Sequence, residues 1–203
     1  MKSLFNKKGF TLIELIVGVS IFTAVALAAI GTLSIARDGA RRTQIIRTVL
    51  DNVNFAVESM SRKIRVGTKY HCGTTGTLSD PRDCSSSPES SMTFTVDRGA
   101  LGCISRYTYA LGNHPDGKGK ITVKEEITDA YGCTSTVGFA LPQDLTSPDV
   151  DIDLLRFYVR DALSGDFKQP SVTMVVRGVA RTPKGEATTF SLETYATQRK
   201  LDQ

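Results

Sequence analysis

The sequence predicts an α+β protein in which one long N-terminal helix packs on an antiparallel β-sheet. Two observations predict this fold class. The first is an apolar run from Phe10 to Ala36, which carries Glu14 as its single charge and continues into an amphipathic stretch. The second is a series of alternating apolar residues later in the chain, separated by turn residues, which is typical of strands. A helix and a sheet of this kind form two layers around one core.

Residues 10–36 form the most apolar part of the chain, and no charge occurs from Leu15 to Ala36. The run exceeds the roughly 20 residues that cross a bilayer as a helix, so we expect a membrane-spanning helix. A secretory signal peptide is one alternative, but its apolar core is usually about 7–15 residues long. A plain signal anchor is another, and the basic residues on the two sides of the run do not decide its orientation.

The helix is expected to continue through residues 37–66. One apolar stripe recurs there in steps of four and three, which is the pattern of an amphipathic helix. It consists of Ile46, Leu50, Val53, Val57, Met60 and Ile64. We expect the helix to end near Val66 and Gly67, because glycine commonly terminates helices.

Residues 67–203 are predicted to form a β-rich globular domain that contains disulfides. It opens with a loop over residues 67–91 that is rich in Gly, Ser, Asp and Pro. Period-two apolar patterns follow, and they predict one antiparallel sheet of about four to seven strands. The residues that alternate are Phe94 and Val96, Ile121 and Val123, Leu155, Phe157 and Val159, Val172, Met174 and Val176, and Phe190 and Leu192.

All four cysteines follow the apolar run, and none forms a CxxC motif. An even number of cysteines in a domain outside the membrane indicates two disulfides made in an oxidising compartment. Three connectivities are open. We favour Cys72–Cys84 together with Cys103–Cys133, because each of these pairs closes a local loop.

The charge balance gives little support to nucleic-acid binding. The net charge is +4, with 25 basic and 21 acidic residues, but Lys2, Lys7 and Lys8 all precede Gly9. Without the first nine residues, 22 basic residues face 21 acidic ones, which is too small an excess to argue for a phosphate-binding surface. Residues 112–118 fit most of a phosphate-binding loop, but Gly119 stands where Ser or Thr is required. Pro115, Asp116 and Gly117 instead predict a hairpin turn.

Three aspartates, Asp149, Asp151 and Asp153, are candidates for calcium ligands if the segment is extended. The run fails as an EF-hand, because Leu154 and Arg160 replace the glycine and the glutamate of that loop. A solvated acidic loop is the alternative, and we expect no cofactor. The two histidines, His71 and His114, complete no metal-ligand or catalytic pattern, so we expect that the chain is not an enzyme.

The segment Lys7-Lys-Gly9-Phe10-Thr-Leu-Ile-Glu14-Leu-Ile16 closely resembles the prepilin processing motif of type IV pilins and type II secretion pseudopilins. The resemblance implies that residues 1–9 are a leader, that prepilin peptidase cleaves after Gly9, and that Phe10 becomes the N-methylated first residue. It also implies assembly with other pilin subunits through residues 10–36. Gly31 stands where major pilins often carry a helix-bending proline.

Glu14 is expected to act in that assembly. A carboxylate at the centre of a membrane helix costs on the order of 2–3 kcal/mol on insertion scales, so such a group is normally paired. Cleavage creates a cationic α-amino group on Phe10, which the Glu14 of a neighbouring subunit could neutralise. Such a buried pair can fix the register of two chains.

The family resemblance also implies a location and a function. We expect a single-pass protein of the bacterial inner or cytoplasmic membrane, with its globular domain outside the cytoplasm, that is assembled into an extracellular or periplasmic filament. Residues 52–65 and 190–199 are similar to J-type pseudopilins and W-type minor pilins, which favours a minor structural subunit. The alternative is a pilus-tip module that binds DNA or surfaces through residues 67–150, with the basic residues Arg98, Arg106, Lys118, Lys120 and Lys124.

Overall fold

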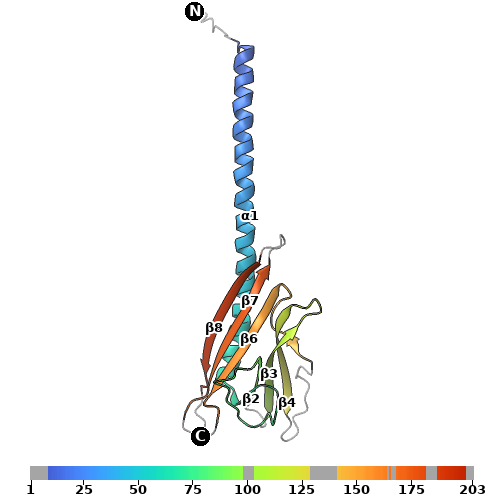
Figure 1. Cartoon of the computed structure of the whole chain (residues 1–203), viewed down its shortest axis with the longest axis vertical. Coiled ribbons are helices and arrows are strands. Elements are labelled where there is room, and N and C mark those ends of the chain that lie inside the picture. The colour runs from blue at the N-terminus through green and yellow to red at the C-terminus, as the bar shows by residue number, and fades with distance from the viewer. Residues whose placement is uncertain are drawn as a thin grey trace, which may run out of the picture. The chain divides into compact units, whose positions relative to one another are not determined.

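The computed structural model describes residues 9–97, 103–128, 141–163, 165, 168–181 and 187–199. Within these ranges it contains helix α1 (Leu12–Arg65) and eight strands (Figure 1). The strands are β1 (Thr68–Cys72), β2 (Ser91–Asp97), β3 (Ile104–Asn113), β4 (Gly119–Thr128), β5 (Gln143–Asp144), β6 (Val150–Arg160), β7 (Ser171–Arg181) and β8 (Ala187–Thr197). A boundary after Gln44 divides the chain into two compact units, which are described separately.

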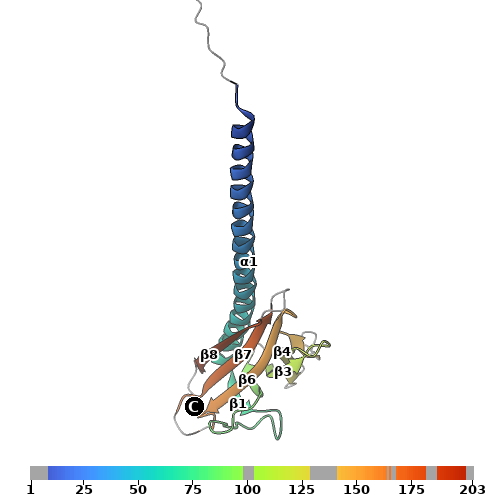
Figure 2. The ribbon, with the colours of Figure 1, turned by 45° about the horizontal axis from the view of Figure 1, so that its top comes forward.

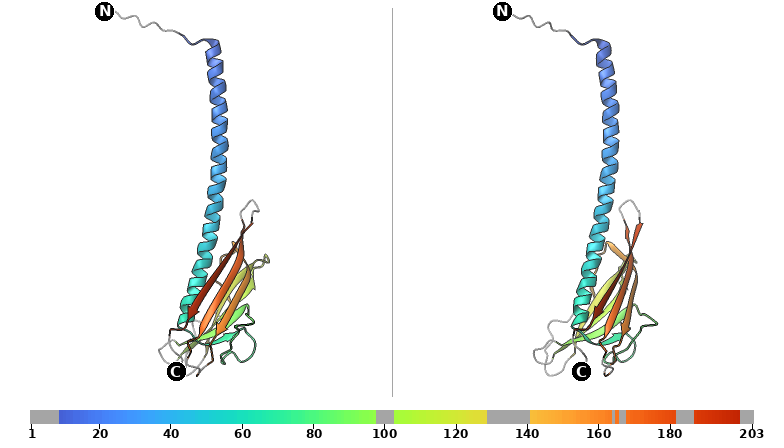
Figure 3. Two further views of the ribbon diagram at one scale, coloured as in Figure 1. Left: turned by 60° about the vertical axis from the view of Figure 1, so that its left-hand side comes forward. Right: turned by 90° about the vertical axis from the view of Figure 1, so that its left-hand side faces the viewer.

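The predicted long helix is confirmed. Helix α1 is 54 residues long, and the first unit, as far as it is described, consists of this helix up to Gln44 and the residues just before it. The second unit begins at Ile45 and contains the rest of α1 together with all the strands. In this unit the helix has strands along one side (Figure 3).

The predicted apolar stripe of the helix faces the core of the second unit. Val53, Met60 and Ile64 are fully buried and Val57 nearly so, whereas Ile46 and Leu50 are half-buried. The buried face is wider than the predicted stripe, since it also includes Val49, Ala56 and Ser61. Strands therefore cover more than one line of side chains on this helix.

The end of α1 is fixed by contacts with the strands that follow it. Gly67 N donates to Ile64 O at 3.0 Å, and the Tyr70 hydroxyl lies 2.6 Å from that same oxygen. These bonds satisfy one of the carbonyl groups that the last turn of a helix leaves without partners. A side chain at residue 67 would overlap the ring of Phe94, so only glycine allows this close approach.

The strands form two antiparallel sheets, where we expected one sheet of about four to seven strands. The first sheet has the order β1-β2-β3-β4-β5 and the second β6-β7-β8 (Figures 1 and 2). The sequence patterns marked β2, β4, β6, β7 and β8 but missed β1, β3 and β5. In β3 the alternating residues are Tyr107, Tyr109 and Leu111, so the period-two signal is carried mainly by tyrosines.

A cluster of aromatic rings joins the first sheet to the helix. Phe94 is fully buried, and its ring centroid lies 5.7–6.0 Å from those of Tyr70, Tyr107 and Tyr109. The Tyr107 hydroxyl donates to Glu125 Oε1 at 2.6 Å, and Lys63 Nζ of α1 donates to the same hydroxyl at 3.2 Å. Burial raises the pKa of Tyr109, so its hydroxyl stays protonated in this cluster.

The second sheet supplies the other half of the core. Every predicted inward residue of β6 and β7 is buried: Leu155, Phe157, Val159, Val172, Met174 and Val176. The β8 residues Phe190 and Leu192 are half-buried and pack against the same cluster. The two sheets and the stripe of α1 thus share one core, which confirms the expected α+β arrangement.

The predicted hairpin turn at residues 115–117 is also confirmed. It connects β3 to β4, with His114 N donating to Lys118 O at 2.7 Å and Gly117 at a φ of +85°. Residues 119–128 then form a strand, whereas a phosphate-binding loop would open a helix. A side chain at Gly119 would overlap Ile152 O, so glycine lets β4 cross close to β6.

The aromatic cluster predicts a large effect of replacing its central ring. We expect Phe94→Ala in the full chain, held in detergent micelles, to lower the free energy of unfolding by about 3–5 kcal/mol, because the change leaves a cavity in the core. The control Leu141→Ala removes a side chain that is 74% exposed and should change stability by less than about 0.5 kcal/mol. Denaturation followed by the circular dichroism of the strands measures both, and equal effects would contradict this account of the core.

Candidate assembly site

The start of helix α1 lies directly after the predicted cleavage residues. Gly9 has open space around it, and Phe10 is 84% exposed. Thr11 caps the helix, since Glu14 N donates to Thr11 Oγ1 at 3.3 Å, and Thr11 Oγ1 donates to Glu14 Oε2 at 3.5 Å. Threonine followed three residues later by glutamate is the capping-box pattern. Glu14 therefore supports the first turn of the helix in addition to being the only charge in the apolar run, a role that the sequence analysis missed.

The large apolar side chains of the first unit are exposed, and no described residue of that unit covers them. All fourteen large ones from residue 10 to residue 35 are 49–84% exposed, and none of the most apolar 18-residue window is buried. Covering them would stabilise the protein by roughly 20–40 kcal/mol, at about 1.5–3 kcal/mol for each side chain. They are Phe10, Leu12, Ile13, Leu15, Ile16, Val17, Val19, Ile21, Phe22, Val25, Leu27, Ile30, Leu33 and Ile35.

Hydroxyl groups in the apolar run bond to the helix itself. Ser20 Oγ donates to Ile16 O at 2.7 Å, Thr23 Oγ1 to Ser20 O at 2.9 Å, and Thr32 Oγ1 to Ala29 O at 2.9 Å. A polar group is costly in an apolar environment unless it is hydrogen-bonded, and these groups already are. Glu14 differs from these hydroxyl groups. Its carboxylate accepts a hydrogen bond from the Thr11 hydroxyl, but this bond does not remove its negative charge. Within the apolar run, Glu14 is therefore the one group whose charge an apolar cover leaves to be neutralised.

Two glycines leave gaps in the surface of this helix. A side chain placed at Gly18 or Gly31 would meet none of the described residues of the first unit within 4 Å. Neither glycine is therefore required by packing inside the subunit. Small residues in a membrane helix allow another helix to approach closely, which suits a surface that is covered by neighbours.

Comparison with protein families found one match, to the prokaryotic N-terminal methylation motif, over residues 4–30. These residues include Gly9, Phe10 and Glu14 and extend along the exposed apolar part of α1. The N-terminal segment is that of a type IV pilin or pseudopilin. Searches of curated proteins and of solved structures found no significant match.

The pilin-type motif has three direct consequences. It points to a structural protein, it implies processing by prepilin peptidase, and it implies assembly with other pilins. Helix α1 is long and apolar enough to cross a membrane, which fits anchoring in the membrane before assembly. The match ends at residue 30, so the globular part of this pilin-like chain must be interpreted from its own contacts.

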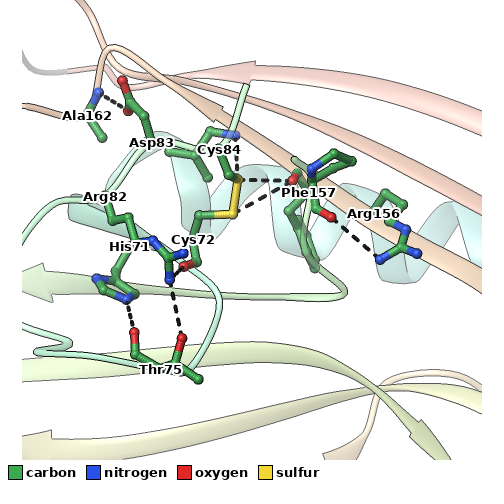
Figure 4. Close-up of a disulfide and its surroundings, with 11 residues drawn as sticks. His71, Cys72, Thr75, Arg82, Asp83, Cys84, Arg156, Phe157 and Ala162 are labelled. Atoms are coloured by element: carbon green, nitrogen blue, oxygen red, sulfur yellow. Dashed lines mark hydrogen bonds between the residues drawn. A yellow bond between two sulfur atoms is a disulfide. The ribbon is translucent and has the colours of Figure 1, made fainter. Parts of the chain in front are cut away.

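A disulfide between Cys72 and Cys84 lies in the core of the globular part (Figure 4). It is the pairing that the sequence favoured for these two residues. The second favoured pairing, Cys103–Cys133, involves a residue that lies outside the described part of the chain.

The segment that begins at the end of the disulfide loop connects the two sheets of the pilin-like chain. On one side Arg82 N donates to Tyr70 O at 2.9 Å, which joins the segment to β1. On the other side Cys84 N donates to Val159 O at 2.9 Å, and Phe157 N donates to Glu89 O at 2.9 Å. Residues 82–89 therefore lie between β1 and β6, and we call them the connecting segment. The composition of residues 67–91 predicted a loop and did not indicate this connection.

Asp83 fixes the connecting segment at the far end of β6. Its carboxylate accepts the backbone N–H groups of Asp161 and Ala162 at 3.2 Å and 2.9 Å (Figure 4). A carboxylate that accepts backbone N–H groups makes stronger hydrogen bonds than a neutral acceptor. Residues 83 and 161 are far apart in sequence, so no local pattern could have indicated this contact.

The basic residues considered for DNA binding are paired with carboxylates where they are described. Lys120 Nζ lies 2.7 Å from Asp144 Oδ1, Lys118 Nζ lies 2.9 Å from Asp116 Oδ2, and both Arg106 and Lys124 contact Glu126. The hydrogen bond from Lys118 lowers the pKa of Asp116. Arg98 lies outside the described residues. These pairs reduce the positive field that a DNA-binding surface requires.

The three candidate calcium ligands are engaged separately. Asp151 Oδ1 accepts Gly119 N at 3.1 Å, Asp153 Oδ1 lies 3.1 Å from Arg177 Nε, and Asp149 Oδ2 accepts the Ser147 hydroxyl at 3.5 Å. An irregularity between Ile152 and Leu154 interrupts the alternation on which the expected common side of the three carboxylates depended. No group of three or more metal-ligating side chains occurs among the residues described.

His71 has a structural role in the loop closed by the disulfide. Its side chain is buried, with Nδ1 2.8 Å from Asp80 O and Nε2 2.9 Å from Thr75 O. The two contacts hold both ends of residues 75–80 against β1. His71 thus supports the loop, and Cys72 beside it is taken by the disulfide.

The disulfide is expected to stabilise the globular part strongly. Replacing both Cys72 and Cys84 by serine should lower the free energy of unfolding by about 2–4 kcal/mol, because the unfolded chain is no longer constrained. Denaturant unfolding of the full chain in micelles measures this loss, with Ser86→Ala at an exposed position of the same segment as the control. A loss no larger than that of the control would contradict the role given to the disulfide.

Proposed function

We propose that this chain is a structural subunit of a bacterial type IV pilus or type II secretion pseudopilus. In this proposal prepilin peptidase removes residues 1–9 by cleavage after Gly9, and Phe10 becomes the N-methylated first residue. One observation carries the proposal: the methylation motif coincides with the start of a helix whose apolar run, residues 10–36, is exposed and carries Glu14 as its single charge.

The proposed assembly step moves the helix from lipid into a filament. Both environments cover the fourteen exposed apolar side chains, so the hydrophobic contribution is largely retained during the transfer. The difference lies at Glu14, because lipid offers it no cation, whereas a neighbouring subunit offers the α-amino group of its Phe10. An ionised carboxylate in an apolar medium is normally paired. The pair would fix the register of adjacent helices as well as the charge balance.

The proposed location and chain organisation follow from this step. Before assembly, residues 10–36 cross the bacterial inner or cytoplasmic membrane once, and the globular domain lies outside the cytoplasm. Residues 37–66 continue the helix into that domain, and residues 67–203 complete it. The buried disulfide supports this placement, because disulfides persist in oxidising compartments.

More specifically, we propose that this chain is a minor subunit of such a filament. This assignment rests on the similarity of residues 52–65 and 190–199 to J-type pseudopilins and W-type minor pilins. In the structure these two segments lie in one unit and are directly bonded, since Arg199 N donates to Arg65 O at 2.7 Å. The alternative is a DNA-binding tip module. Lys118 and Lys120, which were considered for DNA binding, are paired with carboxylates and add no support for it.

The experiment that tests the proposal separates the charge of Glu14 from its capping role. We expect Glu14→Ala to be processed and inserted normally, but to reach sheared filaments at least about tenfold less often than the wild type, because the Phe10 amine of its neighbour loses its partner. Intact-mass measurement reads the processing, and immunoblotting of sheared filaments reads the incorporation.

Thr11→Ala is the matched control for this experiment. It removes the hydroxyl that caps the helix, at a cost of about 0.5–2 kcal/mol of helix stability, but it leaves the carboxylate of Glu14 in place. Incorporation of this variant should stay near the wild-type level. Equal defects in the two variants would assign Glu14 a capping role only, and normal incorporation of Glu14→Ala would overturn its role in assembly.

A further inference from the structure

Strand β8 forms an open edge of the second sheet. The sheet has the order β6-β7-β8, so β8 has β7 on one side and no described strand on the other. Figures 1 and 3 show β8 at the margin of this sheet, beside the last part of α1. β8 is 11 residues long and pairs with β7 over that whole length without an irregularity. It is therefore a long and regular edge strand.

Two hydrogen bonds just beyond β8 show which of its backbone groups face the open edge. Gln198 N donates to Pro170 O at 3.0 Å, on the side of β7. The next residue, Arg199, donates in the other direction, from its N to Arg65 O of α1 at 2.7 Å. Backbone groups alternate in direction along an antiparallel strand, so the odd-numbered residues of β8 direct their N–H and C=O groups to the open edge.

The four central residues of this kind have no partner for these backbone groups in the described part of the chain. Backbone hydrogen bonds outside the regular ladders reach none of them, and their side chains are all exposed. A row of unpaired N–H and C=O groups is a template on which another strand can pair. The four residues, which we call the open row, are Thr189, Ser191, Glu193 and Tyr195.

The other long edges of the two sheets are covered or charged. The connecting segment, residues 82–89, bonds to both β1 and β6. β5 pairs with the first part of β4, and the charged residues 124–126 follow on β4. Proteins commonly protect edge strands with charges, prolines or bulges. β8 contains no proline, lysine or arginine, and its only charge is Glu193. β8 is thus the one long edge that the described residues leave without protection.

The side chains of β8 indicate which kind of strand would fit beside it. On the core side, Phe190 and Leu192 pack against the core but are only half-buried. Apolar side chains on an added strand would complete their burial. On the other side Glu193 is exposed and forms no ion pair with a described residue, so a cation on the added strand would be favourable. Tyr195, at 58% exposure, would pack against an aromatic or β-branched neighbour.

We propose that β8 binds an extended segment of a different subunit of the same filament, which joins the second sheet next to β8. The segment carries apolar residues on the core side and a lysine or arginine beside Glu193. Its main-chain hydrogen bonds to the open row supply the affinity, and the alternating side chains supply the specificity. This contact rests on the proposed function and extends it, because it names a surface and a class of partner within the filament.

A second copy of this chain fits β8 less well than a different subunit does. Antiparallel pairing of β8 with β8 would reverse the second copy, and its helix, which shares a core with β8, would then point away from the common membrane. Parallel pairing of the two β8 strands would turn the second sheet over. Phe190 and Leu192 would then lie beside the polar side of the partner strand. A copy in the same orientation offers β1 or β6, whose outer edges are already covered.

Hydrogen exchange at single amides of the wild-type chain tests this contact directly. In the full chain purified alone in micelles, the amides of the open row should exchange fast, and those that bond to β7 should exchange slowly. In sheared filaments the open-row amides should slow at least about a hundredfold, because they become hydrogen-bonded. Mass spectrometry with electron-transfer fragmentation resolves the single amides. Equally fast exchange of the open row in filaments would overturn the proposal.

Photo-crosslinking identifies the partner of β8. A benzoylphenylalanine replaces Tyr195, filaments are assembled in cells, and the crosslinked peptides are identified by mass spectrometry after irradiation. We expect crosslinks to an extended segment of a different filament subunit. Crosslinks to a second copy of this chain, to lipid or to a protein outside the filament would contradict the proposal, and so would assembled filaments without any crosslink from this position.

A pair of variants at Ser191 separates the backbone from the side chain. Ser191→Pro removes an N–H group that the fold does not use, which an edge strand tolerates, and should lower the crosslink yield about tenfold or more. Ser191→Ala keeps the N–H group and should leave the yield unchanged. Equal yields in two variants that melt at the wild-type temperature would count against strand addition. If the proline variant melts lower, the exchange measurement on the wild type decides.

Failure of this contact and failure of the proposed function give different results. If the wild-type chain is neither cleaved after Gly9 nor found in sheared filaments, the proposed function is wrong. If it is cleaved and incorporated while the open-row amides exchange as fast as in micelles, the proposed function stands and β8 is not a binding edge.

Discussion

The uncovered apolar surface of the N-terminal half of helix α1 is the constraint on which the rest of this protein depends. Fourteen large apolar side chains along this part of the helix are exposed and have no cover among the described residues of the first unit. Water is a poor environment for that surface, so it needs an apolar cover, and in the proposed function it passes from one such cover, lipid, to another, the filament. The methylation motif, the hydroxyls bonded within the helix and the isolated charge of Glu14 all relate to this passage.

The globular unit holds two sheets and part of helix α1 around one modest core. The aromatic cluster around Phe94 fixes the first sheet on the helix, and the connecting segment, residues 82–89, joins that sheet to the second. The Cys72–Cys84 disulfide closes the loop that positions this segment.

The helix and the buried strands could be predicted from sequence because their signals are local and periodic. The stripe from Val53 to Ile64 and the alternation of Leu155, Phe157 and Val159 each follow one regular spacing. The connecting segment could not be predicted, since its structure depends on backbone bonds to β1, which has no clear strand signal, and to β6, which is distant in sequence. For the same reason the division into two sheets was missed. At the assembly site the motif was evident, but the cap formed by Thr11 was overlooked although its spacing to Glu14 is a known signal.

The central claim is that a neighbouring subunit supplies the cation that Glu14 lacks. Electron cryomicroscopy of filaments that contain this chain, at a resolution that shows side chains, tests it most directly. We expect the Glu14 carboxylate to lie about 3 Å from the α-amino nitrogen of Phe10 in an adjacent subunit, within a core of packed α1 helices. A Glu14 carboxylate that faces water, or that pairs only with the Phe10 amine of its own chain, would contradict the claim.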